Sequence, residues 1–256
     1  MRRDDLLQTF DLTDRVAIVT GGSRGIGLAV AQGFAAMGAK VVIASRKADA
    51  CAEAVRTIEA DGGTALAVPT HVGDLDQLAG LVETTVAEMG GIDIVFNNAA
   101  NPLAQMIGSL TPEAWQKSFD ANLRGPVFLV QHALPHLIAS DHAAVVNMIT
   151  AGVYTSGRYL SMYVAAKTAM LAYTRSMAAE LAPHAIRVNA LAPGAVETQM
   201  LTAMDPASQK AAVASQLIHR MAAPTEMVPG ALFLASDASS FMTGHALILD
   251  GGMTTG

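Results

Sequence analysis

Tyr163 and Lys167 are the two side chains whose types and spacing point most directly to acid–base chemistry. They lie four residues apart in a stretch of helical composition, and positions i and i+4 share one face of a helix. A free tyrosine titrates at about 10, and a neighbouring ammonium group favours its phenolate form. The pair therefore predicts a general acid and base that interconverts a carbonyl and an alcohol. Taken alone, this spacing is more typical of a solvated helix face; it gains weight because it follows a phosphate-binding motif and a fifth strand.

A glycine-rich segment near the start of the chain predicts a phosphate-binding turn. Residues 20–27 read Thr-Gly-Gly-Ser-Arg-Gly-Ile-Gly between an apolar run and a helical stretch. Glycines there permit a tight turn and a close approach of the backbone to a pyrophosphate, which the helix N-terminus attracts. The alternative is a purely structural turn. The expected contacts are Gly21, Ser23, Arg24, Gly25, Ile26 and Gly27.

The elements that must position these residues alternate between short apolar strands and longer helices. Strands are expected at 16–20, 41–45, 64–68, 92–97, 144–149, 186–192 and 246–249. Helices are expected at 26–37, 48–60, 75–89, 112–139, 160–182 and 226–236. This alternation predicts an α/β fold, a doubly wound parallel sheet of Rossmann type with helices on both faces. The sequence shows no linker or internal repeat, so residues 1–256 are expected to form a single domain. The connection 197–223 is longer than usual and is expected to be a substrate lid.

Composition narrows the class of protein further. The chain has 256 residues, 52% of them hydrophobic and 15% charged, with a formal charge of −6. These values exclude intrinsic disorder and argue against nucleic acid as a partner. No signal peptide or membrane-length apolar run is evident, so a cytoplasmic location without membrane partners is expected. Cys51 is the only cysteine, and His132 and His136 lack an acidic partner in their motif, so no metal site is expected.

With these motifs in order, the chain resembles the short-chain dehydrogenase/reductase family, from Leu12 to Gly252. Further matches are Asn-Asn-Ala-Ala at 97–100, Asn122 in Asp-Ala-Asn-Leu-Arg-Gly, and Pro193-Gly194 after the sixth strand. The resemblance implies that Tyr163 exchanges the substrate proton and that Lys167 binds the nicotinamide ribose and lowers the pKa of the tyrosine. It also implies that Asn122 places a water linking Lys167 to solvent, and that residue 150 polarises the substrate oxygen. The implied cofactor contacts also include His71, Val72, Asn98, Ala99, Ala100, Tyr163, Lys167, Pro193, Gly194, Val196 and Thr198.

Three positions depart from the family pattern. Thr150 stands where the family usually has serine, and it keeps a hydroxyl but adds a methyl group that restricts its rotamers. Ser156 and Ser161 are nearby hydroxyls that offer an alternative. Ala100 replaces a glycine, and His71 replaces the aspartate that usually meets the adenine amino group.

The end of the second expected strand bears on the choice of cofactor. An NAD site places a carboxylate there to bind the adenosine ribose, but this chain has Ser45, Arg46 and Lys47. A guanidinium binds a phosphate in a forked geometry, and Arg24 is placed to reach the same side. We therefore expect a preference for NADP(H), with NAD(H) possible; the alternative is that Arg46 and Lys47 are simply solvated.

The expected function is an NADP(H)-dependent oxidoreductase acting on a small carbonyl or secondary alcohol. The alternatives are a 3-oxoacyl-thioester reductase of the acyl-carrier-protein type and a catalytically silent dinucleotide-binding regulator. A methyltransferase would place an acidic residue after the second strand. Stretches 112–139 and 160–182 are apolar around much of their circumference, which predicts a homotetramer, with a dimer as second choice. The apolar residues counted for this interface are Val127, Phe128, Leu129, Leu134, Met170, Leu171, Ala178 and Ala179.

Overall fold

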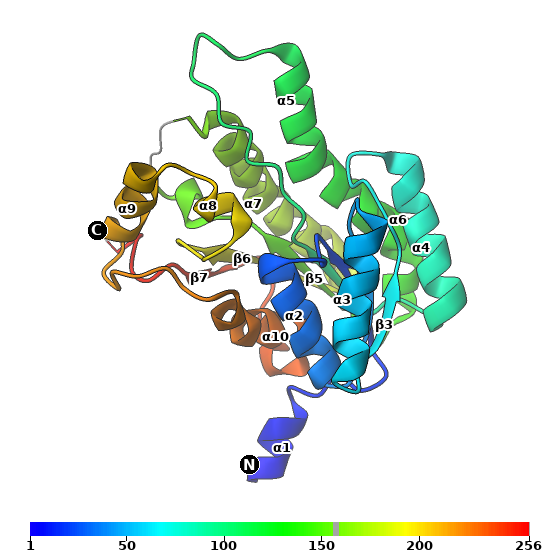
Figure 1. The fold of residues 1–256 in the computed structure, drawn as a ribbon. Helices are drawn as coiled ribbons and strands as arrows, with labels where there is room; N and C mark the ends of the chain where they lie inside the picture. The colour runs from blue at the N-terminus through cyan, green and yellow to red at the C-terminus, as the bar shows by residue number, and fades with distance from the viewer. Residues whose placement is uncertain (156–158, 256) are drawn as a thin grey trace.

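Seven parallel strands form one sheet at the centre of the molecule, in the order β3-β2-β1-β4-β5-β6-β7. The computed structural model describes residues 1–155 and 159–255 (Figure 1). The chain builds outward from β1 to β3 and then crosses back to β4, which is the doubly wound arrangement that the sequence predicted. The strands are β1 (Val16–Thr20), β2 (Lys40–Ala44), β3 (Thr64–Ala67), β4 (Ile94–Asn97), β5 (Ala144–Met148), β6 (Arg187–Pro193) and β7 (Ala246–Leu249).

Helices cover both faces of this sheet, as buried parallel strands require (Figure 1). One apolar cluster joins α2, α3 and α10 to one face, with Phe34 and Phe96 in edge-to-face contact. A second cluster packs α4, α6 and α7 on the other face. The longer helices are α2 (Gly25–Ala36), α3 (Ala48–Ala60), α4 (Leu75–Met89), α5 (Pro112–Phe119), α6 (Gly125–Ala139), α7 (Ser161–Leu181) and α10 (Val228–Ala235).

The expected helix over 112–139 was wrong as a single regular element. α5 ends at Phe119, a π-helical turn η1 covers Asp120–Arg124, and α6 continues from Gly125. A side chain at Gly125 would collide with the Val72 carbonyl, 1.9 Å from the position of its Cβ, so the close approach there requires glycine. Two further segments carry helices that the sequence pattern did not indicate, namely α1 (Arg3–Gln8) and, within 197–223, α8 (Gln199–Thr202) with α9 (Pro206–Ala214).

Part of the apolar surface of α6 and α7 serves the subunit itself. Helix α7 packs against β6, α5 and η1, so it needs more than one apolar stripe. Four of the residues counted toward a subunit interface are therefore buried within the single chain, namely Leu129, Met170, Leu171 and Ala178. Phe128 stays 38% exposed, and Trp115 and Tyr173 are also exposed on these helices.

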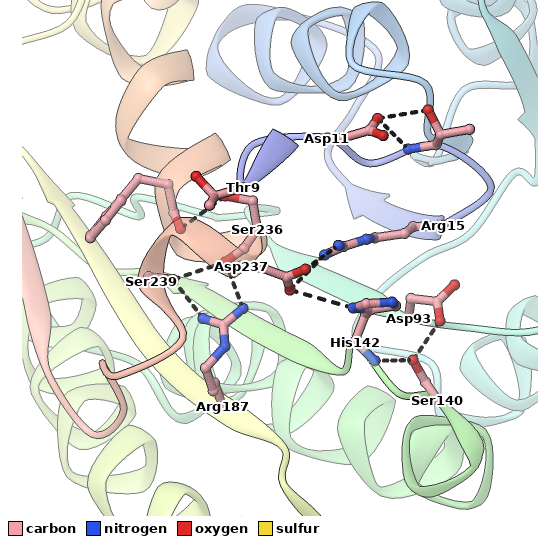
Figure 2. A network of polar contacts seen from close by, with 12 residues as sticks. Thr9, Asp11, Arg15, Asp93, Ser140, His142, Arg187, Ser236, Asp237 and Ser239 are labelled. Carbon is pink, nitrogen blue, oxygen red and sulfur yellow. Dashed lines mark hydrogen bonds and ion pairs between the residues drawn. The ribbon is translucent and has the colours of Figure 1, made fainter. Parts of the chain in front are cut away.

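A charged network ties the elements together at the amino ends of the strands (Figure 2). The buried Arg15 guanidinium donates to both carboxylate oxygens of Asp237, at 3.2 and 2.6 Å. Arg187, the first residue of β6, donates to Ser239 Oγ and to carbonyls near the end of α10. His142 meets the same Asp237 carboxylate at 3.4 Å. This network lies at the sheet edge opposite the candidate site and fastens the C-terminal elements to β1 and β6.

Candidate active site

The glycine-rich segment forms the turn from β1 into α2. Gly21 and Gly25 have φ of +66° and +55°, a region that side chains disfavour. A Cβ at Gly27 would lie 2.3 Å from the Gly21 carbonyl oxygen. Arg24 precedes α2 without capping it, so the first N–H groups of this helix, from Gly25 onward, lack a partner within the helix. An uncapped helix start beside a close-packed glycine turn fits the pyrophosphate of a dinucleotide.

Asn98 and Ala99, which follow β4, hydrogen-bond to Thr20 at the start of the glycine turn. Asn98 Nδ2 donates to the Thr20 carbonyl at 2.9 Å, and the N–H groups of Asn98 and Ala99 donate to Thr20 Oγ1 at 3.0 Å each. Ser23 N–H donates to Ser45 Oγ at 3.4 Å, which joins the turn to the end of β2. Thr20 begins the glycine-rich segment 20–27 but was not among the contacts expected from the sequence; its hydroxyl at the end of β1, within this motif, is the signal that could have indicated its role.

Tyr163 and Lys167 lie one turn apart on the buried face of α7, as predicted. The Lys167 ammonium lies 5.9 Å from the centre of the tyrosine ring, and it donates to the Met148 carbonyl at 2.7 Å. Burial raises the pKa of Tyr163 to about 12 and lowers the pKa of Lys167 to about 7. The expected lowering of the tyrosine pKa is therefore not found in the protein without cofactor, because burial outweighs an ammonium group that is bonded to a backbone carbonyl.

Thr150 follows β5 and begins the short helix η2 (Ala151–Val153). Its Oγ1 accepts the Gly152 N–H at 3.2 Å. That bond uses an acceptor lone pair and leaves the hydroxyl proton available to donate to a substrate oxygen. Of the two alternative hydroxyls, Ser161 begins α7 and is exposed, while Ser156 lies outside the described residues.

Asn122 is fully buried within the π-helical turn η1. Its Nδ2 donates to the carbonyls of Asn101 and Ser118 at 2.8 Å each, and its Oδ1 accepts the Asn101 N–H at 3.0 Å. These bonds fix the Asn101 segment, which continues the polar run 97–100. Single π-helical turns occur frequently at functional sites.

The segment after β6 brings the lid to the glycine turn. Pro193 ends β6, Val196 pairs with Ala222, and Thr198 precedes α8, close to Gly25. The Arg24 guanidinium donates to Gln199 Oε1 at the start of α8.

A buried glutamine supports the same segment from behind. Gln216 Oε1 accepts the Ala195 N–H at 2.6 Å, and a Cβ at Gly194 would come within 2.7 Å of that oxygen. A cavity of about 470 Å³ lies beyond, between the 216–222 stretch and Asp250–Gly252. Thr150, Tyr163 and Lys167 do not line this cavity, whereas Gly194, one of the expected cofactor contacts, does.

The remaining candidate cofactor residues lie around the end of β2. Ser45 is half-buried just after β2, whereas Arg46 and Lys47 are exposed ahead of α3. His71 is exposed, and its ring Nδ1 accepts the Gly73 N–H at 3.1 Å. Val72 packs its carbonyl against Gly125.

These candidates all come from segments that follow the carboxyl ends of strands. In a doubly wound sheet this edge holds the ligand crevice. Turns after β1, β2, β4, β5 and β6 contribute to it, and α7 supplies the Tyr163–Lys167 pair. Among residues 1–155 and 159–255, no group of three or more His, Cys, Asp or Glu side chains is arranged to hold a metal ion. Within the same ranges, no helix has the length and apolar character of a membrane span.

Comparisons with known proteins agree with this architecture. Residues 21–254 match the family model described as Enoyl-(Acyl carrier protein) reductase. Human dehydrogenase/reductase SDR family member 4 is 34% identical over 94% of this chain and 88% of its own length. Galactitol 2-dehydrogenase of Agrobacterium fabrum is 37% identical, covering 94% of this chain and 98% of the relative. Cis-4-hydroxycyclohexanecarboxylate dehydrogenase of Sinomonas cyclohexanicum is 38% identical, covering 94% and 97%.

Solved structures give the same result. A short-chain type dehydrogenase/reductase from Mycobacterium marinum superimposes with a TM-score of 0.93 at 33% identity, covering 98% of this chain and all of the other. A Beutenbergia cavernae structure with NADP bound at low occupancy reaches a TM-score of 0.91 at 33% identity, covering 97% of this chain and 100% of that one. The chain belongs to the short-chain dehydrogenase/reductase family. It is an NAD(P)-dependent oxidoreductase of carbonyl and alcohol groups.

Proposed function

We propose that this protein is an NADP(H)-dependent oxidoreductase of small ketones and secondary alcohols, with Tyr163 as its general acid and base. The observation that carries the proposal is the buried Tyr163–Lys167 pair on α7, at the sheet edge that also bears Thr150 and the glycine turn. Burial disfavours the ammonium form of Lys167 and the phenolate form of Tyr163, so a buried pair of these groups at the ligand edge of the sheet favours a functional role.

Each of the four candidate catalytic residues has a separate task in this proposal. A bound nicotinamide dinucleotide supplies or accepts the hydride. The Thr150 hydroxyl donates a hydrogen bond to the substrate oxygen and orients it. Tyr163 gives its phenolic proton to that oxygen during reduction and takes it back during oxidation. Lys167 binds the ribose and favours the phenolate by its charge. Asn122 places a water that links Lys167 to solvent, and its side chain holds the Asn101 segment.

NADP(H) is the preferred cofactor in this proposal, and NAD(H) remains possible. Ser45, Arg46 and Lys47 place no carboxylate after β2, and Arg46 and Lys47 are exposed and free of described ion pairs. Arg24 lies in the glycine turn beside Ser23, whose N–H already contacts Ser45. A phosphate at this point would meet the side chains of Arg46 and Lys47, whereas the Arg24 guanidinium donates to Gln199 at the start of α8. In cells, a preference for NADPH favours carbonyl reduction.

The substrate is a free small molecule that the 197–223 lid covers. Relatives named for galactitol and for a hydroxycyclohexanecarboxylate both oxidise alcohols on small molecules. Helix α6, residues 125–139, contains no lysine or arginine, which disfavours an acidic carrier protein at this face. The second candidate is a 3-oxoacyl-thioester reductase of the acyl-carrier-protein type; the description of the matching family model names an acyl carrier protein, with an enoyl group in place of the 3-oxoacyl group.

Assembly and location complete the proposal. Exposed Trp115, Phe128 and Tyr173 on α5, α6 and α7 support pairing of these helices between subunits, in a homotetramer or else a dimer. A cytoplasmic location stays a prediction from the sequence.

The test is an assay of reduced-nicotinamide absorbance with both cofactors and a panel of cyclic ketones, keto sugars and 3-oxoacyl thioesters. Turnover of the free ketones with NADPH supports the proposal, and turnover of thioesters alone supports the second candidate. Tight cofactor binding without any turnover across the panel would instead indicate a silent dinucleotide-binding regulator.

A further inference from the structure

A chain of buried polar side chains crosses the sheet behind the candidate site. Asn97 on β4 and Asn147 on β5 are register partners, and Asn97 Nδ2 donates to Asn147 Oδ1 at 2.9 Å. Asn147 Nδ2 then donates to Thr174 Oγ1 on α7 at 3.0 Å. Asn147 and Thr174 are fully buried and Asn97 is 3% exposed. Asn97 Oδ1 has no hydrogen-bond partner among the described residues, whereas the side-chain polar atoms of Asn147 and Thr174 are paired. Buried polar groups are costly unless they are paired, so the geometry of Asn147 and Thr174 is strongly determined.

The direction of these hydrogen bonds is fixed by Thr174. Its hydroxyl donates to the Met170 carbonyl at 2.9 Å, one turn back in α7. A hydroxyl has a single proton, so Thr174 must accept from Asn147. That requirement orients the Asn147 amide and leaves its Oδ1 to accept from Asn97. These hydrogen bonds therefore have one arrangement, in which Thr174 Oγ1 is the atom of α7 that Asn147 contacts.

The same strand also holds α7 at the proposed catalytic lysine. Thr174 lies seven residues after Lys167, about two helical turns, so the two side chains share a face. Lys167 Nζ donates to the carbonyl of Met148, the residue that follows Asn147. Adjacent residues of β5 thus hold α7 at two points, and only the Asn147–Thr174 contact is independent of the proposed catalytic groups.

The network also reaches the elements that carry the other candidates. Asn97 Nδ2 lies 3.4 Å from the Pro126 carbonyl, at the start of α6 and just after the turn that holds Asn122. The next residue, Asn98, donates to the glycine turn through Thr20. A displacement of the Asn97–Asn147 pair would consequently move both the start of α6 and the glycine turn, which lie on the two sides of the crevice.

We infer that Asn147 and Thr174 are positioning residues, which fix helix α7 against β5 and thereby place Tyr163 and Lys167 at the crevice. This inference rests on the proposed role of Tyr163 and Lys167. It adds two residues that contribute nothing to the chemistry directly and act only through the helix they hold.

The test compares Thr174→Val with a matched control, Thr85→Val. Thr85 on α4 is also fully buried, and its hydroxyl makes the same type of bond to the carbonyl four residues back, here Leu81. Thr174→Val is expected to lower kcat about tenfold or more through misplacement of the acid–base pair. The NADPH dissociation constant, measured by fluorescence without turnover, should stay within about twofold, since the glycine turn is retained. The apparent pKa in the kcat/KM profile should move by about half a pH unit or more, because water reaches the loosened pair.

Two further variants sharpen the comparison. Thr174→Ser keeps the acceptor oxygen and is expected to restore kcat and the pH profile. The double variant Asn147→Leu with Thr174→Val leaves no unpaired Asn147 donor, and Asn97 Nδ2, which loses Asn147 Oδ1, keeps the Pro126 carbonyl at 3.4 Å as an acceptor. It should still show the altered pH profile. Amide hydrogen exchange over residues 161–171 in the cofactor-free protein should be faster in Thr174→Val and in the double variant than in Thr85→Val.

The inference is overturned if Thr174→Val and the double variant keep the parent kcat and pH profile, or if Thr85→Val changes them equally. A change that Thr174→Ser fails to rescue would also overturn it. Tyr163→Phe, assayed in parallel, separates this result from the function itself. An active Tyr163→Phe protein contradicts the proposed function, whereas an inactive one beside an unaffected Thr174→Val protein rejects only the positioning role.

Discussion

Lys167 and Met148 are joined by a hydrogen bond of 2.7 Å from the lysine Nζ to the methionine carbonyl oxygen. The bond holds an ammonium group inside the protein, at the end of β5, one helical turn from Tyr163. A backbone carbonyl compensates only part of the hydration that the charge loses. The lowered pKa of about 7 expresses this cost, and it has a measurable consequence for stability.

Lys167→Met is expected to stabilise the cofactor-free protein at neutral and mildly acidic pH while abolishing its activity. The pKa of Lys167 is about 7 when folded and 10.5 ordinarily. Between these values the unfolded chain binds more protons, so the free energy of unfolding of the parent protein rises with pH. Buried Lys167 thus destabilises the folded protein fully below a pH of about 7, and this destabilisation is gone above a pH of 10.5. Burial raises the pKa of Tyr163 from 10.0 to about 12. Its titration therefore lowers the free energy of unfolding as pH rises above 10.0, which opposes the effect of Lys167 there.

Thermal melting between pH 6 and about 9.5 measures this effect over the window in which Lys167 dominates. The parent melting temperature should climb relative to that of Lys167→Met as pH rises. The exposed Lys210 gives the matched control, and Lys210→Met should follow the parent curve. Parallel curves for Lys167→Met and the parent would show that Lys167 titrates normally in the folded protein.

Thr150→Ala is expected to reduce kcat by about two orders of magnitude, because it removes the proposed donor to the substrate oxygen. Thr150→Ser should be mild, since it keeps the hydroxyl and drops only the methyl group. Steady-state kinetics with a ketone from the panel measures both. Thr155→Ala on the neighbouring exposed segment serves as the control. Parent-like activity in Thr150→Ala would mean that another hydroxyl polarises the oxygen.

The end of β2 is expected to select NADP(H) over NAD(H) by roughly tenfold or more, as a charge-assisted contact to a phosphate contributes about 1.5–3 kcal/mol. Ser45→Asp combined with Arg46→Ala should reverse the preference, because a carboxylate binds the ribose hydroxyls and repels a 2′-phosphate. The measurement is kcat/KM with each cofactor in both proteins. Equal efficiencies in the parent, or no swing in the double variant, would show that this end of β2 does not read the phosphate.

Helices α5, α6 and α7 are expected to bury Trp115, Phe128 and Tyr173 between subunits. Light scattering should then give the mass of four chains, or of two as the second choice. Phe128→Glu should lower the assembled mass, because it places a charge in an apolar contact. Phe241, fully exposed on another segment, gives the control Phe241→Glu. A parent mass of one chain that does not change on dilution would refute the assembly.

Local patterns in the sequence predicted the sheet, both helical layers and the bounds of α3 and α4. Apolar runs and their periodicity decide those features, and they are visible along the chain. The π-helical turn around Asn122 was not predicted. Gly125, which follows it, lies against the Val72 carbonyl, a contact between distant parts of the chain that local periodicity does not reveal. The carbonyl of Met148 that accepts from Lys167 belongs to the backbone, so the residue type at this position does not predict the contact. The Asn147–Thr174 contact likewise joins residues from distant parts of the chain.

The pKa values of Tyr163 and Lys167 also depend on contacts that the local sequence does not reveal. An i, i+4 spacing states that Tyr163 and Lys167 are neighbours, and from this alone the cation should lower the pKa of the phenol. The spacing does not state that both are buried or that a carbonyl already binds the ammonium group. Burial depends on the packing of α7 against β5, β6 and η1, which only the folded structure reveals.

Tyr163→Phe tests the central proposal most directly, because it keeps the ring and removes the only proton that the mechanism moves. The measurement is kcat with NADPH and a ketone substrate, beside the dissociation constant of NADPH from the same protein. Tyr173→Phe, on the same helix and outside the candidate site, is the matched control; it keeps the ring that the proposed subunit contact buries, so it should retain parent activity. The account predicts that Tyr163→Phe loses at least about two orders of magnitude in kcat with cofactor binding largely intact. Turnover close to that of the parent enzyme, with NADPH still bound, would contradict it.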